Sequence, residues 1–221
     1  MKIVALVPSR LNGSSVPSKN IKELGNVPLV NYTIKTLNRI DGIDIIFLYA
    51  SEPTILKYIH KSLKYTYLER PAHLDSEKTT IQDIIKEFLK KEDADIIVLW
   101  HITSPFLKAE TIKECLDRVR SGDFDLSFTA FAIKSFCLYE GRPLNYDLDK
   151  PTPKKRDLPP VVVEQSALYV FRREVFERKK RRIGQKPFVK FINHLEGHDI
   201  DTEEDFAIAE MIVESNLFHL Y

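Results

Sequence analysis

Glycine is scarce in this sequence, with seven glycines among 221 residues, whereas an average protein holds about 7%. The scarcity excludes collagen-like repeats and Gly/Ser linkers. No two glycines lie two positions apart, which excludes the G-x-G-x-x-G fingerprint of dinucleotide-binding dehydrogenases, and no Gly-Lys-Ser/Thr sequence ends a Walker A loop. A phosphate-binding loop in this chain must therefore use few glycines, and Gly13 is the candidate for such a loop.

Cysteine is also rare, the net charge is small, and the sequence contains no long apolar run. The two cysteines, Cys115 and Cys137, exclude a disulfide framework and are expected to be reduced thiols of a cytoplasmic protein. The formal net charge of +1 argues against a general nucleic-acid binder. No segment approaches the roughly 20 apolar residues of a membrane span, and the apolar run before Pro8 is too short for a signal peptide. We expect a cytoplasmic protein with neither nucleic acid nor membrane as partner.

Short apolar runs alternate with amphipathic segments along most of the chain. This pattern predicts an α/β fold, with three layers and a Rossmann-like, mainly parallel sheet. We treat residues 1–221 as one domain with an inserted excursion at about residues 134–160, which are rich in Pro, Lys, Asp and Tyr. The predicted strands are residues 2–7, 43–50, 65–68, 95–101, 125–133, 161–171 and 188–195. The predicted helices begin at Pro28 and Ser51 or span residues 79–91, 109–120 and 202–217.

Three polar segments, at residues 8–19, 101–105 and around 199–201, lie beyond the ends of predicted strands, where open α/β sheets bind ligands. Arg10 and Lys19 flank the polar loop after the first strand, and backbone N–H groups and cations of this kind can surround a phosphate. The alternative is a surface turn with ordinary solvated cations. Near the C-terminus, Asp199 and Asp201 place two carboxylates two residues apart, which suits Mg²⁺. The alternative there is that Asp201 caps the next helix while Asp199 lies in solvent.

Five segments in the same order together resemble the CMP-sialic acid synthetase family, also called acylneuraminate cytidylyltransferases. The similarity runs nearly from end to end of the chain. The segments that carry it are Val7-Pro8-Ser9-Arg10 through Ser18-Lys19-Asn20-Ile21-Lys22, Pro28-Leu29-Val30-Asn31-Tyr32-Thr33-Ile34, Glu69-Arg70-Pro71-Ala72, Thr103-Ser104-Pro105 and Asp199-Ile200-Asp201-Thr202-Glu203-Glu204-Asp205-Phe206.

The resemblance implies that CTP and an acceptor give a cytidylylated acceptor and pyrophosphate. It implies CTP phosphates at Arg10 and the loop after it, charge stabilisation by Lys19, and Mg²⁺ at Asp199 and Asp201. Asn20 and Arg70 would lie along the cytidine, with Thr80 near the base. The implied catalytic residues are Arg10, Lys19 and Asp201, and the implied loop residues are Leu11, Asn12, Gly13, Ser14 and Ser15. The resemblance also implies surface-glycan biosynthesis, in a capsule or lipopolysaccharide, and a homodimer formed through the excursion.

The sequence departs from the family on the side that would face the acceptor. His101-Ile102 stands where the family has Gln-Pro, and Gln165-Ser166-Ala167 where it has Asn-Gly-Ala. The acceptor is therefore a small anion, either an acidic nine-carbon sugar or a phosphorylated molecule that gives a CDP-linked product. His101 fits a phosphate as well as a sugar hydroxyl, or is a packed strand-end histidine. Arg156, with its neighbouring lysines, fits either anion or belongs to a solvated basic run.

A non-catalytic relative that only binds a nucleotide is the competing functional class for this chain. The retention of Arg10, Lys19 and both aspartates argues against it. The cations at Arg172, Arg173 and residues 178–182 are interpreted as a solvated helix face, because the overall charge is close to zero.

Overall fold

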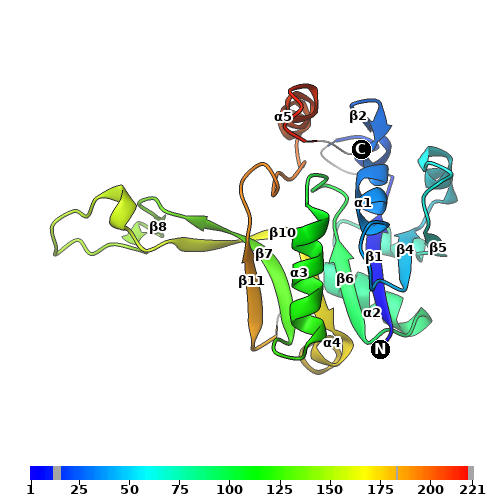
Figure 1. The fold of residues 1–221 in the computed structure, drawn as a ribbon, viewed down its shortest axis with the longest axis horizontal. Coiled ribbons are helices and arrows are strands. Elements are labelled where there is room, and N and C mark those ends of the chain that lie inside the picture. The colour runs from blue at the N-terminus through cyan, green and yellow to red at the C-terminus, as the bar shows by residue number, and fades with distance from the viewer. Residues whose placement is uncertain (12–15, 183, 219–221) are drawn as a thin grey trace.

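The computed structural model describes residues 1–11, 16–182 and 184–218, and a seven-stranded sheet forms its centre (Figure 1). The strand order is β11-β7-β10-β6-β1-β4-β5. β10 runs antiparallel to both of its neighbours, and the other neighbouring strands pair in parallel. This confirms the mainly parallel α/β sheet. The strands are β1 (Ile3–Ser9), β4 (Ile45–Ala50), β5 (Thr66–Glu69), β6 (Ile96–Trp100), β7 (Leu126–Ile133), β10 (Val161–Arg172) and β11 (Pro187–Phe191).

Helices cover both faces of the sheet and give three layers. β1 shows why, since Ile3, Ala5 and Val7 are buried in one core while Val4 and Leu6 are buried in the other. The first core contains apolar residues of α1, α3 and α5, and the second contains those of α2 and α4. The helices are α1 (Leu29–Leu37), α2 (Ile81–Lys91), α3 (Ala109–Arg120), α4 (Arg173–Lys179) and α5 (Glu203–Glu214). Short 3₁₀ helices span Lys19–Ile21, Pro53–Tyr58, Ala72–Asp75 and Lys155–Asp157.

Several elements differ from the prediction at their ends. The expected helix at Ser51 is wrong: a 3₁₀ helix begins after Glu52, and the Ser51 hydroxyl instead donates to the carboxylate of Asp75 at 2.5 Å. The last strand ends at Phe191 rather than at residue 195. Helix α4 and the two-stranded hairpin β2–β3 (Glu23–Leu24, Val27–Pro28) were not predicted. These elements are too short to show a clear hydrophobic periodicity in the sequence, and they depend on packing against the sheet and the neighbouring helices.

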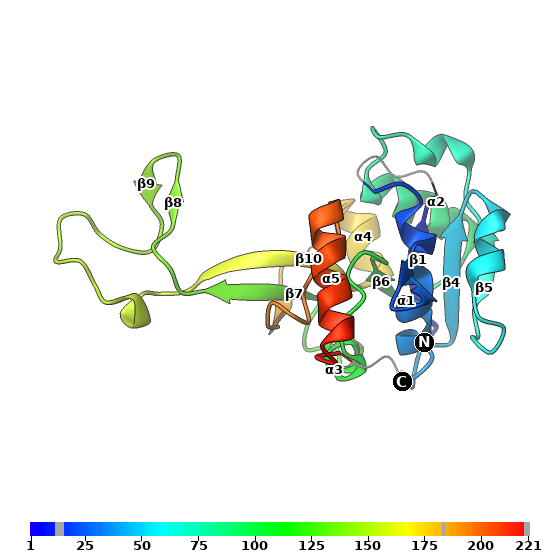
Figure 2. The same ribbon diagram turned by 90° about the horizontal axis from the view of Figure 1, so that it is seen from above.

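The predicted excursion is a long arm that leaves the sheet between β7 and β10 (Figures 1 and 2). A small hairpin, β8 (Leu138–Tyr139) with β9 (Arg142–Pro143), and the 3₁₀ helix Lys155–Asp157 lie on it. Several of its large apolar side chains are exposed, namely Phe136, Leu138, Tyr139, Leu144 and Leu148, whereas Leu158 is buried. Within residues 1–11, 16–182 and 184–218, the structure contains no helix that meets the length and hydropathy of a membrane span.

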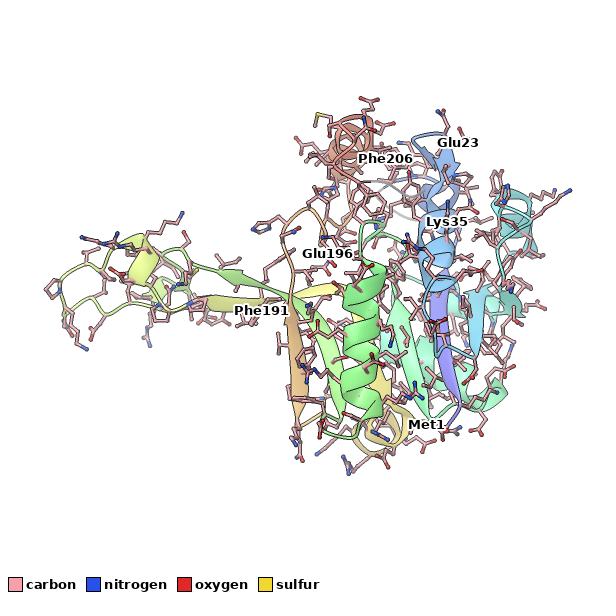
Figure 3. The ribbon with its side chains drawn as sticks, viewed as in Figure 1. Met1, Glu23, Lys35, Phe191, Glu196 and Phe206 are labelled. Carbon is pink, nitrogen blue, oxygen red and sulfur yellow. The ribbon has the colours of Figure 1, made fainter. Side chains whose placement is uncertain are left out.

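Helix α5 packs on the β2–β3 hairpin. The ammonium group of Lys22 lies 4.0 Å from the centre of the Phe206 ring, and Phe206 projects from α5 toward this hairpin (Figure 3). Between β2 and β3, Gly25 and Asn26 have φ angles of 56° and 63°, which are typical of the tight turn of a two-residue hairpin. A Cβ atom on Gly25 would lie 2.5 Å from Cγ1 of Val213 on α5. Gly25 therefore permits both the turn and the close approach of α5.

We expect Gly25→Ala to lower the free energy of unfolding by at least about 1 kcal/mol more than Gly141→Ala does. Both glycines have positive φ angles, but nothing lies within 4 Å of a Cβ atom placed on Gly141. The comparison thus separates the clash with α5 from backbone strain. Urea unfolding of both variants measures the difference, and equal losses would contradict the packing role of Gly25.

Candidate active site

A cavity of about 550 Å³ opens at the carboxyl ends of β1 and β6. The two strands are parallel neighbours, and the chain continues from them toward opposite edges of the sheet. Such a reversal of strand order is where open α/β sheets bind ligands. The cavity brings together these residues predicted for the site: Arg10, Lys19, Asn20, Arg70, His101, Asp199 and Asp201.

Asn20 ties the start of the loop to the end of β1. Its side-chain amide donates to Ser9 Oγ at 3.0 Å and to the Arg10 carbonyl at 2.8 Å. The guanidinium group of Arg10 donates across the cavity wall to the carbonyl of Asp75 at 3.1 Å. These hydrogen bonds hold the Arg10 side chain against the 3₁₀ helix Ala72–Asp75 while it lines the cavity.

The predicted phosphate loop is described at its two ends. Leu11 is buried in the hydrophobic core, and Val16 is buried where the loop returns to the cavity wall. The predicted binding residues between them, Asn12, Gly13, Ser14 and Ser15, lie outside the described residues. Leu11 thus fixes the departure of the loop from β1 by packing rather than by lining the cavity.

Lys19 connects this loop to the acidic turn before α5. Its ammonium group lies 3.6 Å from a carboxylate oxygen of Asp201 and donates a short hydrogen bond to the carbonyl of Ile200. The Lys19 side chain is 15% exposed and that of Asp201 is 75% exposed. The cation is therefore held in place, while the carboxylate stays open to the cavity.

Asp199 is positioned from the opposite side, by the segment that follows β6. Ser104, which is fully buried, donates its hydroxyl hydrogen to Oδ1 of Asp199 at 3.0 Å. The N–H of Ile200 donates to the carbonyl of Thr103 at 2.8 Å. The acidic turn is thereby fixed to the end of β6, with both aspartates on the cavity wall.

Asp199 and Asp201 are the residues that could hold a metal ion. In the described part of the chain, no three His, Cys, Asp or Glu side chains gather in a metal-binding group. The protein thus offers two carboxylates, and the other ligands of an octahedral ion would be water and substrate oxygens. Mg²⁺ is commonly bound in this way, through one or two carboxylates and phosphate oxygens, so the donor set fits it.

Arg70 is a buried cation on the wall formed after β5. It is 3% exposed, and its guanidinium group pairs with the carboxylate of Asp75, which also accepts from the Ser51 hydroxyl. Its Nε atom is buried without a hydrogen-bond partner among the described residues. Asp75 therefore holds Arg70 in one orientation at the cavity.

His101 directly follows β6 and has a lowered pKa. Its backbone N–H donates to the Ala167 carbonyl at 3.0 Å, and its Nε2 atom is buried without a partner among the described residues. Burial, followed by the positive charge of Arg182, lowers the pKa of His101 to about 4, although Asp199 opposes the shift. At neutral pH the imidazole is uncharged.

Besides Leu11, three residues predicted for the site do not line the cavity. Thr80 caps α2, where its hydroxyl accepts from the Asp83 N–H at 3.3 Å in a capping box. Gln165 is buried below the cavity, where its amide donates to the Gly197 carbonyl at 3.0 Å and contacts Ser104 Oγ at 3.4 Å. Arg156 lies on the arm, with an exposed side chain that faces Asp157 at 3.7 Å.

Other residues line the cavity without having been predicted, among them Ser76, Thr79, Thr103 and Ser166. Thr79 precedes Thr80, so the capping box of α2 could have indicated that Thr80 is occupied by the helix. Ser166 follows Gln165 in β10, where neighbouring residues point to opposite faces. Only one of the two can face the cavity, and the structure selects Ser166.

Comparison with known proteins identifies the family. The chain matches the family described as "Cytidylyltransferase" over residues 4–220. This chain belongs to the cytidylyltransferase family. The resemblance to CMP-sialic acid synthetases is thus confirmed. An N-acylneuraminate cytidylyltransferase of Streptococcus agalactiae serotype V is 25% identical over 216 residues, covering 93% of this chain and 52% of the relative. The CMP-N,N'-diacetyllegionaminic acid synthase of Legionella pneumophila is 22% identical and covers 98% of each chain.

Solved structures share the cytidylyltransferase fold of this chain. A CMP-2-keto-3-deoxy-manno-octonic acid synthetase complexed with CTP superposes with a TM-score of 0.72 at 14% identity, covering 97% of this chain and 99% of the other. A 4-diphosphocytidyl-2C-methyl-D-erythritol synthase of Anaerococcus prevotii gives a TM-score of 0.63 at 18% identity, covering 96% of each chain. The chain spans about half the length of the first curated relatives that it matches.

The depressed pKa of His101 predicts an acid-sensitive fold. The folded value is about 4 and the unfolded value about 6.5. Between these values the unfolded state binds more protons, so the free energy of unfolding falls as the pH falls through this window. We expect the wild type to lose about 2 kcal/mol more than His101→Gln between pH 7 and pH 5. Urea unfolding at the two pH values measures this, and parallel losses in both proteins would contradict it.

Proposed function

We propose that this chain transfers CMP from CTP to a hydroxyl group of a small anionic acceptor, with release of pyrophosphate. The observation that carries the proposal is the juxtaposition, in one cavity, of Arg10, Lys19 and Arg70 with the two carboxylates Asp199 and Asp201. Cations and a carboxylate-bound Mg²⁺ are the groups that neutralise a triphosphate during transfer. Membership of the cytidylyltransferase family supports CTP as the nucleotide.

In the proposed reaction, the acceptor oxygen forms a bond to the α-phosphorus of CTP. The bond from that phosphorus to the bridging oxygen of the β-phosphate breaks, pyrophosphate leaves, and the hydroxyl proton passes to solvent or to a base. Arg10 and residues 12–15 bind the phosphates, Leu11 supports the start of that loop from the core, and Lys19 stabilises the charge that develops on the phosphate oxygens. Asn20 and Arg70 lie along the cytidine, with Thr80 near the base.

Asp199 and Asp201 hold the proposed Mg²⁺, which polarises phosphate oxygens and orients them for displacement when it is bound. Ser104 fixes one carboxylate from below, and Lys19 flanks the other. Lys19 therefore lies beside a carboxylate oxygen of Asp201, which would be one of the ligands of the metal ion. These contacts support catalysis over a non-catalytic nucleotide-binding role.

The acceptor side is formed by His101 and by the segment around Gln165. The relatives named above act on acidic sugars according to their names, which supports an acidic nine-carbon sugar and a role in surface-glycan biosynthesis. A phosphorylated acceptor, which would give a CDP-linked product, is the second candidate. His101 does not decide between the two candidates, since an uncharged imidazole can donate one hydrogen bond to a phosphate oxygen or to a sugar hydroxyl.

We further propose a cytoplasmic homodimer that forms through the arm. The exposed apolar side chains at Leu138, Tyr139 and Leu148 support this, because large contiguous apolar surfaces mark interaction sites. The 3₁₀ helix Lys155–Asp157, which contains Arg156, lies on the same arm, and the arm extends away from the rest of the fold (Figure 2). A contribution of Arg156 to acceptor binding would therefore be made to the cavity of a second copy.

We expect Asp201→Asn to reduce pyrophosphate release from CTP by about a hundredfold or more, because it removes one charged ligand of the proposed metal. Asp201 is exposed, so the melting temperature should stay close to that of the wild type. Glu204→Gln is the matched control, since Glu204 is also exposed but does not line the cavity. Equal activity in Asp201→Asn and wild type would contradict the metal role.

Removal of Mg²⁺ provides an independent test. With EDTA present, CTP turnover with each of a panel of acidic sugars and phosphate esters should fall to background and return when excess Mg²⁺ is added. Coupled detection of pyrophosphate measures the rate. Unchanged turnover in EDTA would contradict a metal-dependent reaction, while absence of turnover with every acceptor would favour the nucleotide-binding module.

A further inference from the structure

Arg182 occupies an unexpected place for a residue at the end of a basic run. Its guanidinium carbon lies 3.8 Å from the centre of the Tyr169 ring. Tyr169 is fully buried on β10, so the cation is stacked on the sheet rather than extended into solvent. The interpretation of the whole run as a solvated helix face is therefore wrong at Arg182, since helix α4 ends at Lys179, three residues earlier.

Two observations place Arg182 close to the cavity. Ser166 lines the cavity, and its hydroxyl lies close enough to the Tyr169 phenol to influence the pKa of that group. His101 also lines the cavity, and the charge of Arg182 is the second largest cause of its lowered pKa, after burial. The guanidinium group therefore lies close to two residues of the cavity wall at β6 and β10, although Arg182 is not itself one of the residues that line the cavity.

Among the residues that the structure describes, Arg182 has no anionic partner. No hydrogen bond or ion pair involves its side chain within residues 1–11, 16–182 and 184–218. Other cations of the cavity differ, because Arg70 pairs with Asp75 and Lys19 with Asp201. A guanidinium group in a planar stack keeps its N–H donors free at the edge, where they match the oxygens of a carboxylate or a phosphate.

The carboxylate of Glu164 already accepts a hydrogen bond from the tyrosine whose ring supports Arg182. Glu164 accepts the hydroxyl hydrogen of Tyr169 at 2.7 Å. Burial, together with this hydrogen bond, raises the pKa of Tyr169 to about 12, although the positive charge of Arg182 opposes the shift. Tyr169 thus stays a neutral donor to Glu164, and its ring supports the cation. The exposed carboxylate of Glu164 remains able to accept hydrogen bonds from hydroxyl groups.

We propose that Arg182 binds the anionic group of the acceptor and so determines which acceptors enter this cavity, a proposal that rests on the proposed function. Arg182 supplies the charge, while Ser166, His101 and Glu164 offer hydrogen-bonding groups for the rest of the molecule. The ligand class is a small hydroxylated anion. A carboxylate and a phosphate present the same oxygens to a guanidinium group, so the test includes both.

The test uses isothermal titration of the full chain with N-acetylneuraminate as the carboxylate probe and ribitol 5-phosphate as the phosphate probe. Each is titrated with and without a non-hydrolysable CTP analogue and Mg²⁺. We expect at least one probe to bind the wild type, and Arg182→Gln to weaken that binding by about tenfold or more. Arg182→Lys, which keeps the charge but loses the planar stack, should lie between the two.

Arg181→Gln is the matched control, because Arg181 is an exposed neighbour, whereas Arg182 packs on the ring of Tyr169. It should bind the probes as the wild type does, and the CTP analogue should bind all variants equally. Equal probe affinity in Arg182→Gln and wild type would overturn the proposal, as would a wild type that binds neither probe. Failure of the proposed function has a different signature, since there the CTP analogue itself would not bind the wild type.

Discussion

The catalytic half of the cavity depends on the peptide groups around Ile200. This residue is fully buried, its N–H donates to the Thr103 carbonyl at 2.8 Å, and its carbonyl accepts from Lys19. The end of β6, the loop after β1 and the acidic turn before α5 are thereby joined at one residue. Burial of the middle residue of Asp199-Ile200-Asp201 also explains why both carboxylates reach the cavity, since alternate residues of an extended segment share one side.

The cations of the cavity are held by different means, which suits different tasks. Arg70 is buried and paired with Asp75, so its orientation is set before any ligand arrives. Such a buried pair adds little to stability in itself, but loss of either partner leaves an uncompensated charge. Lys19 is less enclosed, and its ion pair with Asp201 is open to solvent on the carboxylate side. Asp201 would therefore be the solvent-open carboxylate at which a metal ion could be held.

Much of this arrangement could be predicted from the sequence, because strand ends in a parallel sheet meet at one edge and the polar segments follow those ends. Arg10, His101 and Asp199 were found in this way. The face of Gln165 could not be predicted, since β10 changes register between Glu164 and Tyr169, and a bulge shifts the period-two alternation. Arg182 was missed because its contact with Tyr169 joins two segments whose packing depends on where α4 ends.

The two ends of the cavity also differ in whether hydrogen bonds connect them to the acidic turn before α5. Gln165 contacts both Ser104 and the Gly197 carbonyl, and Ser104 holds Asp199, so this part of β10 belongs to the same hydrogen-bonded unit as the acidic turn. A change at Gln165 would therefore disturb a carboxylate of the proposed metal site. Arg182 packs on the ring of Tyr169, close to His101 and Ser166 on the cavity wall, and forms no hydrogen bond with that unit within the described chain. If Arg182 sets acceptor preference as proposed, a substitution there would leave the hydrogen bonds around Asp199 in place, whereas a change at Gln165 would disturb them.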